Sequence, residues 1–224
     1  NTGTDYFLFG NKVEAVAKEN NILFSVNWVE GQKTGFFLDQ RENRKLLGEF
    51  SKDKKVLNTF CYTGGFSIYA MSAGAELVTS VDISQKAVDL AASNMELNFP
   101  NTNHKAVADD VFNFMKEHTQ QYDVIVLDPP AFAKSIKSKH TATQAYKRLN
   151  IAGLKALAPN GILFTFSCSQ VIDDVLFYNT IAAAAIETGR NIRVLHKLEQ
   201  GPDHPTNIYH PEGHYLKGLV LFVE

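Results

Sequence analysis

The stretch KVLNTFCYTGGFSIYAMSAGAELVTSVDI, residues 55–83, contains two short apolar runs separated by a segment of helical length. The first run, residues 55–60, is typical of a buried strand, and residues 77–83 are similar. Between them, residues 66–75 are expected to form a helix. Two strands joined by a helix lie parallel, so this stretch predicts a strand–helix–strand unit.

The same alternation continues toward the end of the chain. Ser84 is placed to cap a helix over residues 84–98. Further strands are expected at residues 104–109, 122–128, 161–167 and 191–198. The last run, residues 215–224, follows a loop too short for a crossover, so it should be antiparallel to its neighbour. The pattern predicts an α/β fold, a doubly wound, Rossmann-like sheet of seven strands with an antiparallel last strand.

The first fifty residues have a different pattern. Residues 12–30 alternate around Asn20 and Asn21, which predicts a β-hairpin. Residues 31–50 are expected to give a short strand and then a helix capped by Asp39. We therefore predict a linking segment over residues 1–50, the remnant of a central domain, and a main domain over residues 51–224.

The composition limits the class of protein. With 45% hydrophobic and 21% charged residues in 224, the chain resembles a globular protein rather than a disordered one. No apolar run approaches the ~20 residues that span a bilayer, so no membrane association is expected. Two cysteines, Cys61 and Cys168, indicate a reducing cytoplasm. The net charge of −2 does not by itself indicate a nucleic-acid partner, although it can conceal a basic patch.

A pair of glycines, Gly64 and Gly65, follows the first strand of the main domain. Such a pair lets the backbone approach a ligand at a helix N-terminus, but it also suits an ordinary turn. Asp82 ends the next strand, 18 residues after Gly64, where a carboxylate can accept from ribose hydroxyls. The loop lacks the G-x-G-x-x-G spacing of a diphosphate site. We therefore expect S-adenosylmethionine rather than NAD or FAD.

Other side chains are expected near the same cofactor. Asp109 or Asp110, at the end of the third strand, would lie near the adenine, while capping of the next helix is an equally good interpretation. The remaining candidates are Phe60, Tyr62, Thr63, Ile83, Arg41 and Asp128.

The sequence VLDPPAFAKS, residues 126–135, marks the expected chemical centre. Asp128 ends the fourth strand, next to the first across the point where strand order reverses, and ligands of open α/β sheets bind there. Pro129 and Pro130 restrict the backbone and would hold Asp128 and Phe132 in place.

Five motifs together resemble the bacterial large-subunit ribosomal RNA cytosine-5 methyltransferases. In order they are GQKTGFFLDQR, NTFCYTGGFS, VLDPPAFAKS, TFSCSQ and DHPTNIYHPEGHYLKGL, and the resemblance covers roughly residues 30–224. It implies a class I methyltransferase sheet, S-adenosylmethionine as cofactor and large-subunit ribosomal RNA as partner. Members of that family carry a PUA-type RNA-binding domain ahead of the catalytic part, so we expect this chain to be the catalytic part without it.

The resemblance also implies a nucleophile. Carbon 5 of cytosine becomes reactive only after a thiolate adds to carbon 6. Ala131 occupies the position after the proline motif where DNA-type enzymes carry their cysteine, so Cys168, at the end of the fifth strand, is the expected nucleophile. A helix beginning near Val171 should lower its pKa. Asp128 would bond the ring nitrogen and amine of the base, and Cys61 would serve packing.

Two alternatives remain open at this stage. Enzymes that methylate exocyclic amines, and ribosomal guanine-N7 enzymes, share the Asp-Pro-Pro loop but need no thiol. A non-catalytic module that binds cofactor and RNA is the other alternative.

The substrate side is expected to be basic. Residues 134–148 contain five basic and no acidic side chains, which suits an RNA backbone although a solvated face is the usual explanation. The candidate substrate residues are Lys33, Pro129, Pro130, Phe132, Lys134, Lys137, Lys139, Arg148, His204 and Tyr215. His204, His210 and His214 match no compact ligand spacing, so no metal is expected. A homodimer is a further expectation.

Overall fold

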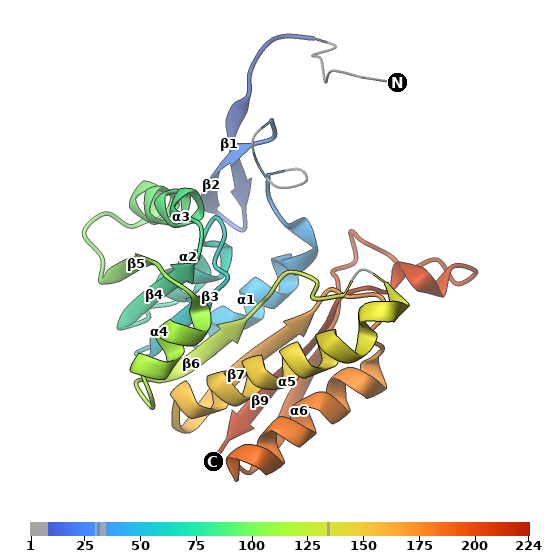
Figure 1. Ribbon diagram of the computed structural model, residues 1–224. Helices are drawn as coiled ribbons and strands as arrows, with labels where there is room; N and C mark the ends of the chain where they lie inside the picture. The colour runs from blue at the N-terminus through green and yellow to red at the C-terminus, as the bar shows by residue number, and fades with distance from the viewer. Residues whose placement is uncertain (1–8, 30, 32–34, 134) are drawn as a thin grey trace.

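The computed structural model describes residues 9–29, 31, 35–133 and 135–224. Within these residues, seven strands form one sheet in the order β5-β4-β3-β6-β7-β9-β8 (Figure 1). The strands are β3 (Lys55–Thr59), β4 (Leu77–Asp82), β5 (His104–Ala108), β6 (Tyr122–Leu127), β7 (Leu157–Ser167), β8 (Ile192–Leu198) and β9 (Lys217–Val223). The α-helices are α1 (Arg41–Glu49), α2 (Gly65–Ser72), α3 (Gln85–Asn98), α4 (Val111–Glu117), α5 (Lys139–Ala156) and α6 (Asp174–Thr188).

The strand order confirms the predicted fold. Neighbouring strands from β5 to β7 run parallel, whereas β9 lies between β7 and β8 and is antiparallel to both. β3 pairs with β4 on one side and with β6 on the other, so the strand order reverses between β3 and β6. The carboxyl ends of these two strands therefore flank the position where ligands bind in open α/β sheets.

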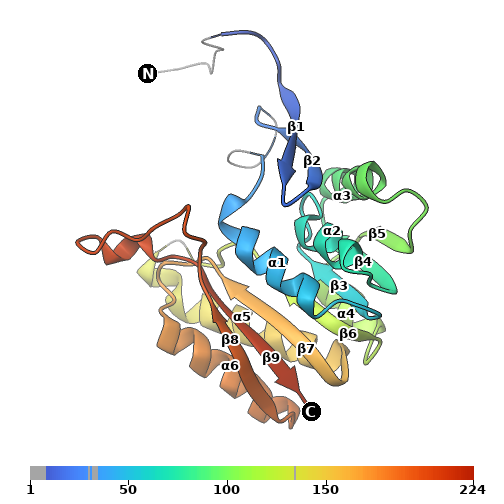
Figure 2. The same cartoon turned by 180° about the vertical axis from the view of Figure 1, so that it is seen from behind.

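Helices cover both faces of the sheet. Figures 1 and 2 show α4, α5 and α6 on one face and α1, α2 and α3 on the other. The central strands are buried on both sides, as Leu57 and Ile125 pack in one core cluster and Val56 and Val124 in the second. This double burial explains why the strands read as continuous apolar runs.

The predicted hairpin is confirmed as a separate two-stranded sheet of β1 (Glu14–Glu19) and β2 (Ile22–Asn27). Asn20 and Asn21 both have positive φ, 48° and 68°, as a two-residue primed turn requires. Asn94 of α3 anchors the hairpin, because its Oδ1 accepts from the backbone N–H of Ser25 at 2.7 Å. The Nδ2 of the same side chain donates to the carbonyl oxygen of Thr63 at 3.0 Å. One buried amide thus joins the hairpin to the loop after β3.

Four local predictions were wrong. In the described part of residues 31–37 there is no strand, and Asp39 caps no helix but lies in a 3-10 turn, η1 (Leu38–Gln40). α6 begins at Asp174 rather than near Val171, because Asp173 accepts from the N–H of Leu176 at 2.8 Å and caps it. β7 begins at Leu157 rather than at residue 161. Its pairing with β6 passes from Leu157 directly to Ile162, so the residues between bulge out.

Two other features complete the architecture. Short 3-10 turns occur at η2 (Ile136–Ser138) and η3 (Pro211–Gly213). Among the described helices, none combines the length and apolar character needed to cross a bilayer. The boundary between residues 50 and 51 stays a prediction.

Candidate active site

The loop after β3 forms one wall of the site. Phe60, Tyr62 and Gly64 have positive φ values of 53°, 45° and 79°, so the chain turns sharply here. Asp82, at the end of β4, accepts from the backbone N–H of Tyr62 at 3.2 Å and from that of Ser84 at 3.0 Å. A carboxylate has about four lone-pair sites, so Asp82 is fixed in place and can still accept from a ribose.

Steric packing explains why Gly64 and Gly65 have no side chain. A Cβ at Gly64 would lie 3.0 Å from the Cβ and 3.1 Å from the Cα of Ala91 in α3. A Cβ at Gly65 would lie 3.0 Å from the Cδ of Arg44. Close packing against α3 at Gly64 and against α1 at Gly65 therefore explains the glycine pair.

The other expected cofactor residues occupy different settings. Thr63 is buried and Phe60 partly buried, whereas Ile83 is 77% exposed. Asp109 accepts from the backbone N–H of Asp110 at 2.7 Å. Asp110 itself caps α4, accepting from the N–H groups of Phe112 and Asn113, so the capping interpretation holds for that residue.

Arg41 turns toward the long loop between β8 and β9. Its guanidinium lies 2.9 Å from Asp203 and 2.9 Å from Glu42. Arg41 therefore joins α1 to that loop beside the site.

Asp128 directly follows the last residue of β6 and is partly buried at the strand-order reversal. Its Oδ1 accepts from Gln40 Nε2 at 3.1 Å. Asn43 Nδ2 donates to the Oε1 of Gln40 at 2.7 Å, which orients the Gln40 amide. Burial, and then the charge of Asp39, raise the pKa of Asp128 to about 7, against the opposing effects of Gln40 and Arg44. This carboxyl can therefore carry a proton at neutral pH.

Asp39 is the main residue that the sequence reasoning missed. It is 8% exposed, and its Oδ2 accepts from the hydroxyl of Tyr215 at 2.7 Å. Its Oδ1 is buried and has no hydrogen-bond partner among the described residues. A buried acceptor left open in this way fits an amino group, which both S-adenosylmethionine and cytosine carry. No linear spacing signals that residue 39 lies near residues 128 and 215.

Cys168 follows the last residue of β7, the strand beside β6, and is partly exposed. Its Sγ lies 3.9 Å from the carbonyl oxygen of Pro129, the residue after Asp128. The structure thus brings the two expected catalytic residues together at one edge of the sheet. Cys61 is instead buried, and burial raises the pKa of its thiol far above the ordinary value.

The proline loop continues into the core. Pro129 is buried and Pro130 is exposed. The ring of Phe132 packs 4.7 Å from that of Tyr146, which fixes the loop against α5.

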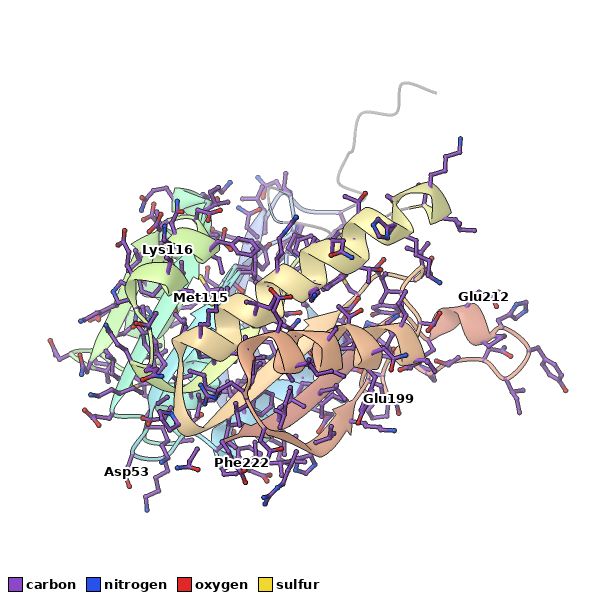
Figure 3. All side chains as sticks on the ribbon, turned by 60° about the horizontal axis from the view of Figure 1, so that its bottom comes forward. Asp53, Met115, Lys116, Glu199, Glu212 and Phe222 are labelled. Carbon is purple, nitrogen blue, oxygen red and sulfur yellow. The ribbon has the colours of Figure 1, made fainter. Side chains whose placement is uncertain are left out.

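The expected substrate residues beyond this loop differ in exposure and in their partners. Lys137 and Arg148 are exposed, whereas Lys139 lies 3.4 Å from Asp173. His204 lies 3.1 Å from Asp203. In Figure 3 the loop that carries Glu212 projects from the body of the molecule. Lys33 and Lys134 lie outside the described residues.

The histidines of this loop do not converge. His204, His210 and His214 each lie beside a different acid: Asp203, Glu212 and Asp174. Among the described residues no three metal-binding side chains form a group. The absence of a metal stays a prediction.

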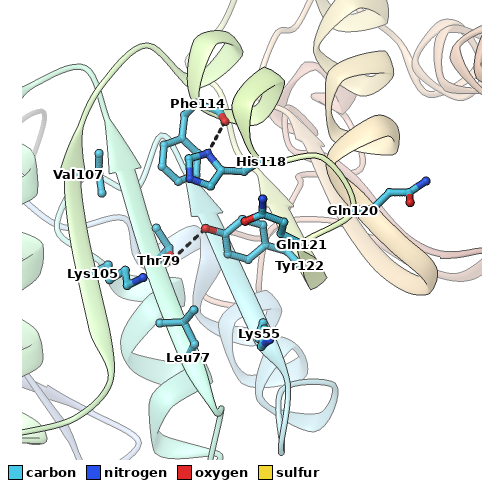
Figure 4. A pocket seen from close by; sticks show the side chains of 10 residues that line it. All are labelled: Lys55, Leu77, Thr79, Lys105, Val107, Phe114, His118, Gln120, Gln121 and Tyr122. Atoms are coloured by element: carbon cyan, nitrogen blue, oxygen red, sulfur yellow. Dashed lines mark hydrogen bonds between the residues drawn. The ribbon is translucent and has the colours of Figure 1, made fainter.

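A cavity of about 600 Å³ lies elsewhere, between the sheet and α4 (Figure 4). Lys55, Leu77 and Tyr122, which line it, are the first residues of three parallel strands. The cavity is therefore at the amino ends of the strands, at the opposite edge from Asp128 and Cys168.

Comparison with known proteins gives consistent matches. The protein family described as S-adenosylmethionine-dependent methyltransferase matches residues 4–220. Ribosomal RNA large subunit methyltransferase I of Aeromonas hydrophila is 42% identical over 224 residues, covering 98% of this chain and 56% of that protein. The chain thus spans about half the length of such curated relatives.

Solved structures match over a similar range. A protein from Streptococcus mutans described as a SAM-dependent methyltransferase superposes with a TM-score of 0.85 at 28% identity, covering 97% of this chain and 57% of that one. A methyltransferase solved in complex with SAH, the demethylated cofactor, gives a TM-score of 0.84 at 29% identity, covering 96% of this chain and 58% of that one.

Proposed function

The chain belongs to the family of S-adenosylmethionine-dependent methyltransferases, and we propose that it methylates carbon 5 of a cytosine in large-subunit ribosomal RNA through a covalent bond to Cys168. The observation that carries this proposal is the position of Cys168, whose Sγ lies 3.9 Å from the carbonyl oxygen of Pro129, beside Asp128. A thiol at this point serves chemistry at a ring carbon and has no use in methylation of an amine.

S-adenosylmethionine supplies an electrophilic methyl group when bound. The residues that would hold it are the loop after β3, including Phe60, Tyr62, Thr63, Gly64 and Gly65, together with Asp82 and Asp109. Asp82 would accept from the ribose, and the open Oδ1 of Asp39 is available to an amino group.

The side chains of this site can carry out the proton and electron transfers. The Cys168 thiolate would donate its electron pair to carbon 6, forming the S–C bond, while Asp128 gives its proton to ring nitrogen 3. The carbon 5–carbon 6 double bond is thereby lost and carbon 5 becomes an enamine-type nucleophile. After carbon 5 is methylated, a base removes its proton and the thiolate leaves, while Asp128 regains the proton from nitrogen 3.

The proton on Asp128 supports this role. Its pKa of about 7, raised by burial and by Asp39, keeps a donor available at neutral pH. The carboxyl is also held by Gln40, so its orientation is set before a base enters.

The RNA assignment rests on the relatives and on the surface near the site. The relative from Aeromonas hydrophila carries the name ribosomal RNA large subunit methyltransferase I. The exposed side chains of Lys137 and Arg148 suit a phosphate backbone, and the base must leave its stack to reach Cys168. The homodimer stays a prediction.

Trapping of the covalent intermediate tests the nucleophile. The chain is incubated with S-adenosylmethionine and ribosomal RNA containing 5-fluorocytidine, whose fluorine cannot be removed as a proton. We expect a protein–RNA adduct for the unmodified chain and for Cys61→Ala, and none for Cys168→Ala. Binding of S-adenosylhomocysteine, measured by calorimetry, should be the same for Cys168→Ala and the unmodified chain.

Nucleoside mass spectrometry identifies the methylated product and can contradict the proposal. Continued 5-methylcytidine formation by Cys168→Ala would exclude Cys168 as the nucleophile. Formation of a methylated guanine or of an amine-methylated base would show that the chemistry belongs to another class.

A further inference from the structure

Lys217 is a charged residue in an otherwise apolar strand. It is the first residue of β9, is 3% exposed, and lies opposite Ser167 in the antiparallel pair with β7. An ammonium group in the interior is strongly unfavourable unless its charge is compensated. The position therefore needs a partner close to the end of β7.

The side chain of Lys217 contacts the turn that carries Cys168. Its Nζ donates to the carbonyl oxygen of Ser169 at 3.0 Å, one residue beyond Cys168. Ser169 in turn donates from its Oγ to the carbonyl oxygen of Ala133 at 2.8 Å. Lys217 thus fixes this turn from one side while the proline loop holds it from the other.

The electrostatic interactions of Lys217 also involve the turn that carries Cys168. Burial lowers the pKa of Lys217, whereas the negative charges of Asp174, Cys168 and Asp173 oppose that effect. Asp173 and Asp174 are exposed at the start of α6, in contact with water. Among the three, Cys168 belongs to the turn whose Ser169 carbonyl oxygen accepts from Lys217.

Two tyrosines that interact with Cys168 are neutral at physiological pH. Burial raises the pKa of Tyr146 to about 12, and burial and Asp39 raise that of Tyr215 still further. Asp128, on the neighbouring strand, can be protonated or negative. α6 begins at Asp174, six residues after Cys168 in the sequence, so the helix does not directly follow the cysteine as predicted.

We propose that Lys217 is a positioning residue that holds the turn of Cys168 and stabilises this side chain as a thiolate. The inference rests on the proposed role of Cys168 as nucleophile. The proton of the thiol passes to solvent, and the electron pair left on sulfur is the one that forms the bond to carbon 6. Lys217 keeps its own proton throughout and does not contact the base.

Alkylation of Cys168 as a function of pH tests the proposal without any methyl transfer. The chain is treated with iodoacetamide across pH 5–10, and modification of the peptide that contains Cys168 is followed by mass spectrometry. In Lys217→Met we expect the midpoint to rise by about one pH unit, since a neighbouring cation depresses a thiol pKa by this order. Lys217→Arg keeps the charge and should retain most of the effect.

A matched control separates a local from a general charge effect. Lys197 is exposed on β8, the strand beside β9, and Lys197→Met should leave the midpoint unchanged. An unchanged midpoint in folded Lys217→Met would overturn the proposal.

A reciprocal measurement covers the case in which Lys217→Met does not fold. If the two groups are coupled, removing the thiolate in Cys168→Ser must lower the pKa of Lys217, observed by NMR of a 13C label at its Cε. An identical lysine titration in both chains would refute the coupling. A coupled pair in a chain whose Cys168→Ala variant still methylates RNA would instead refute only the role of Cys168 as nucleophile.

Discussion

Asp128 shows how one carboxyl group can link the site to the stability of the chain. The ordinary pKa of its side chain is 3.8, and the folded chain raises this to about 7 by burial and the charge of Asp39. Between these values the native state binds a proton that the unfolded state has lost. The free energy of unfolding therefore decreases as the pH rises from about 4 to about 7, by at most about 1.4 kcal/mol per pH unit from this group.

Replacing the carboxyl by an amide should remove this dependence. We expect Asp128→Asn to be more stable than the unmodified chain at pH 8, with the difference shrinking as the pH falls from 7 toward 4. Urea unfolding at a series of pH values measures this difference in the free energy of unfolding. Asp89→Asn, at an exposed position of α3, is the control. A difference between Asp128→Asn and the unmodified chain that is constant from pH 4 to pH 8 would show that Asp128 is not protonated in the native state.

At the residue scale, site residues that follow or end a strand could be predicted from the sequence. Site residues contributed by segments outside the sheet could not. Asp82, Asp128 and Cys168 could be placed because parallel strands end at a common edge. Asp39 and Gln40 come from a 3-10 turn before the sheet, and their approach to Asp128 and Tyr215 depends on packing of α1. Lys217 did carry a signal, a lysine within a buried strand.

At the scale of elements, the loop after β3 depends on one backbone conformation. Gly64 has φ +79°, and a Cβ there would approach Ala91 to 3.0 Å. An alanine in this region is strained by about 1–2 kcal/mol before any clash. In Gly64→Ala we therefore expect the loop to shift and binding of S-adenosylhomocysteine to weaken about tenfold or more, which is about 1.4 kcal/mol.

Gly74 provides a matched control for this change. It has a similar φ of +88°, but the nearest atom to an added Cβ is Lys52 Cγ at 3.9 Å, and it follows α2 at the end remote from the loop. Gly74→Ala should lose comparable thermal stability and keep full cofactor affinity by calorimetry. Equal loss of affinity in both variants would mean that destabilisation, rather than the loop, controls binding.

Element boundaries were predictable where one local signal decided them. Ser84 accepts from the N–H of Ala87 and starts α3 as expected. The start of α6 was expected near Val171, whereas Asp173 two residues further on provides the cap. A capping residue competes with its neighbours through side-chain hydrogen bonds, and a single sequence does not show which one succeeds.

At the scale of the whole molecule, alternation of strands and helices was enough to predict the doubly wound sheet. Burial on both faces leaves few orders in which parallel strands with right-handed crossovers can be arranged. The attachment of the hairpin was not predictable in the same way. It depends on Asn94, whose amide reaches both Ser25 and Thr63 across residues far apart in the sequence.

The basic stretch over η2 and α5 supports a prediction about RNA binding. Two of its cations are paired with acids of the α6 region, Lys139 with Asp173 and Lys147 with Glu187, which favours a structural role for those two. Lys137 and Arg148 are exposed and remain the best candidates for phosphate contacts. We expect Lys137→Glu/Arg148→Glu to weaken binding of single-stranded ribosomal RNA segments and leave cofactor affinity unchanged.

Salt dependence distinguishes phosphate contacts from a general charge effect. Loss of two contacts should reduce the slope of log K against log salt by about 1.4, because each contact to a single strand contributes about 0.7. Lys116→Glu/Lys155→Glu makes the same change of net charge at exposed positions in the last turns of α4 and α5. If this control lowers the slope equally, the RNA is attracted by the overall charge and the α5 surface has no special part in binding.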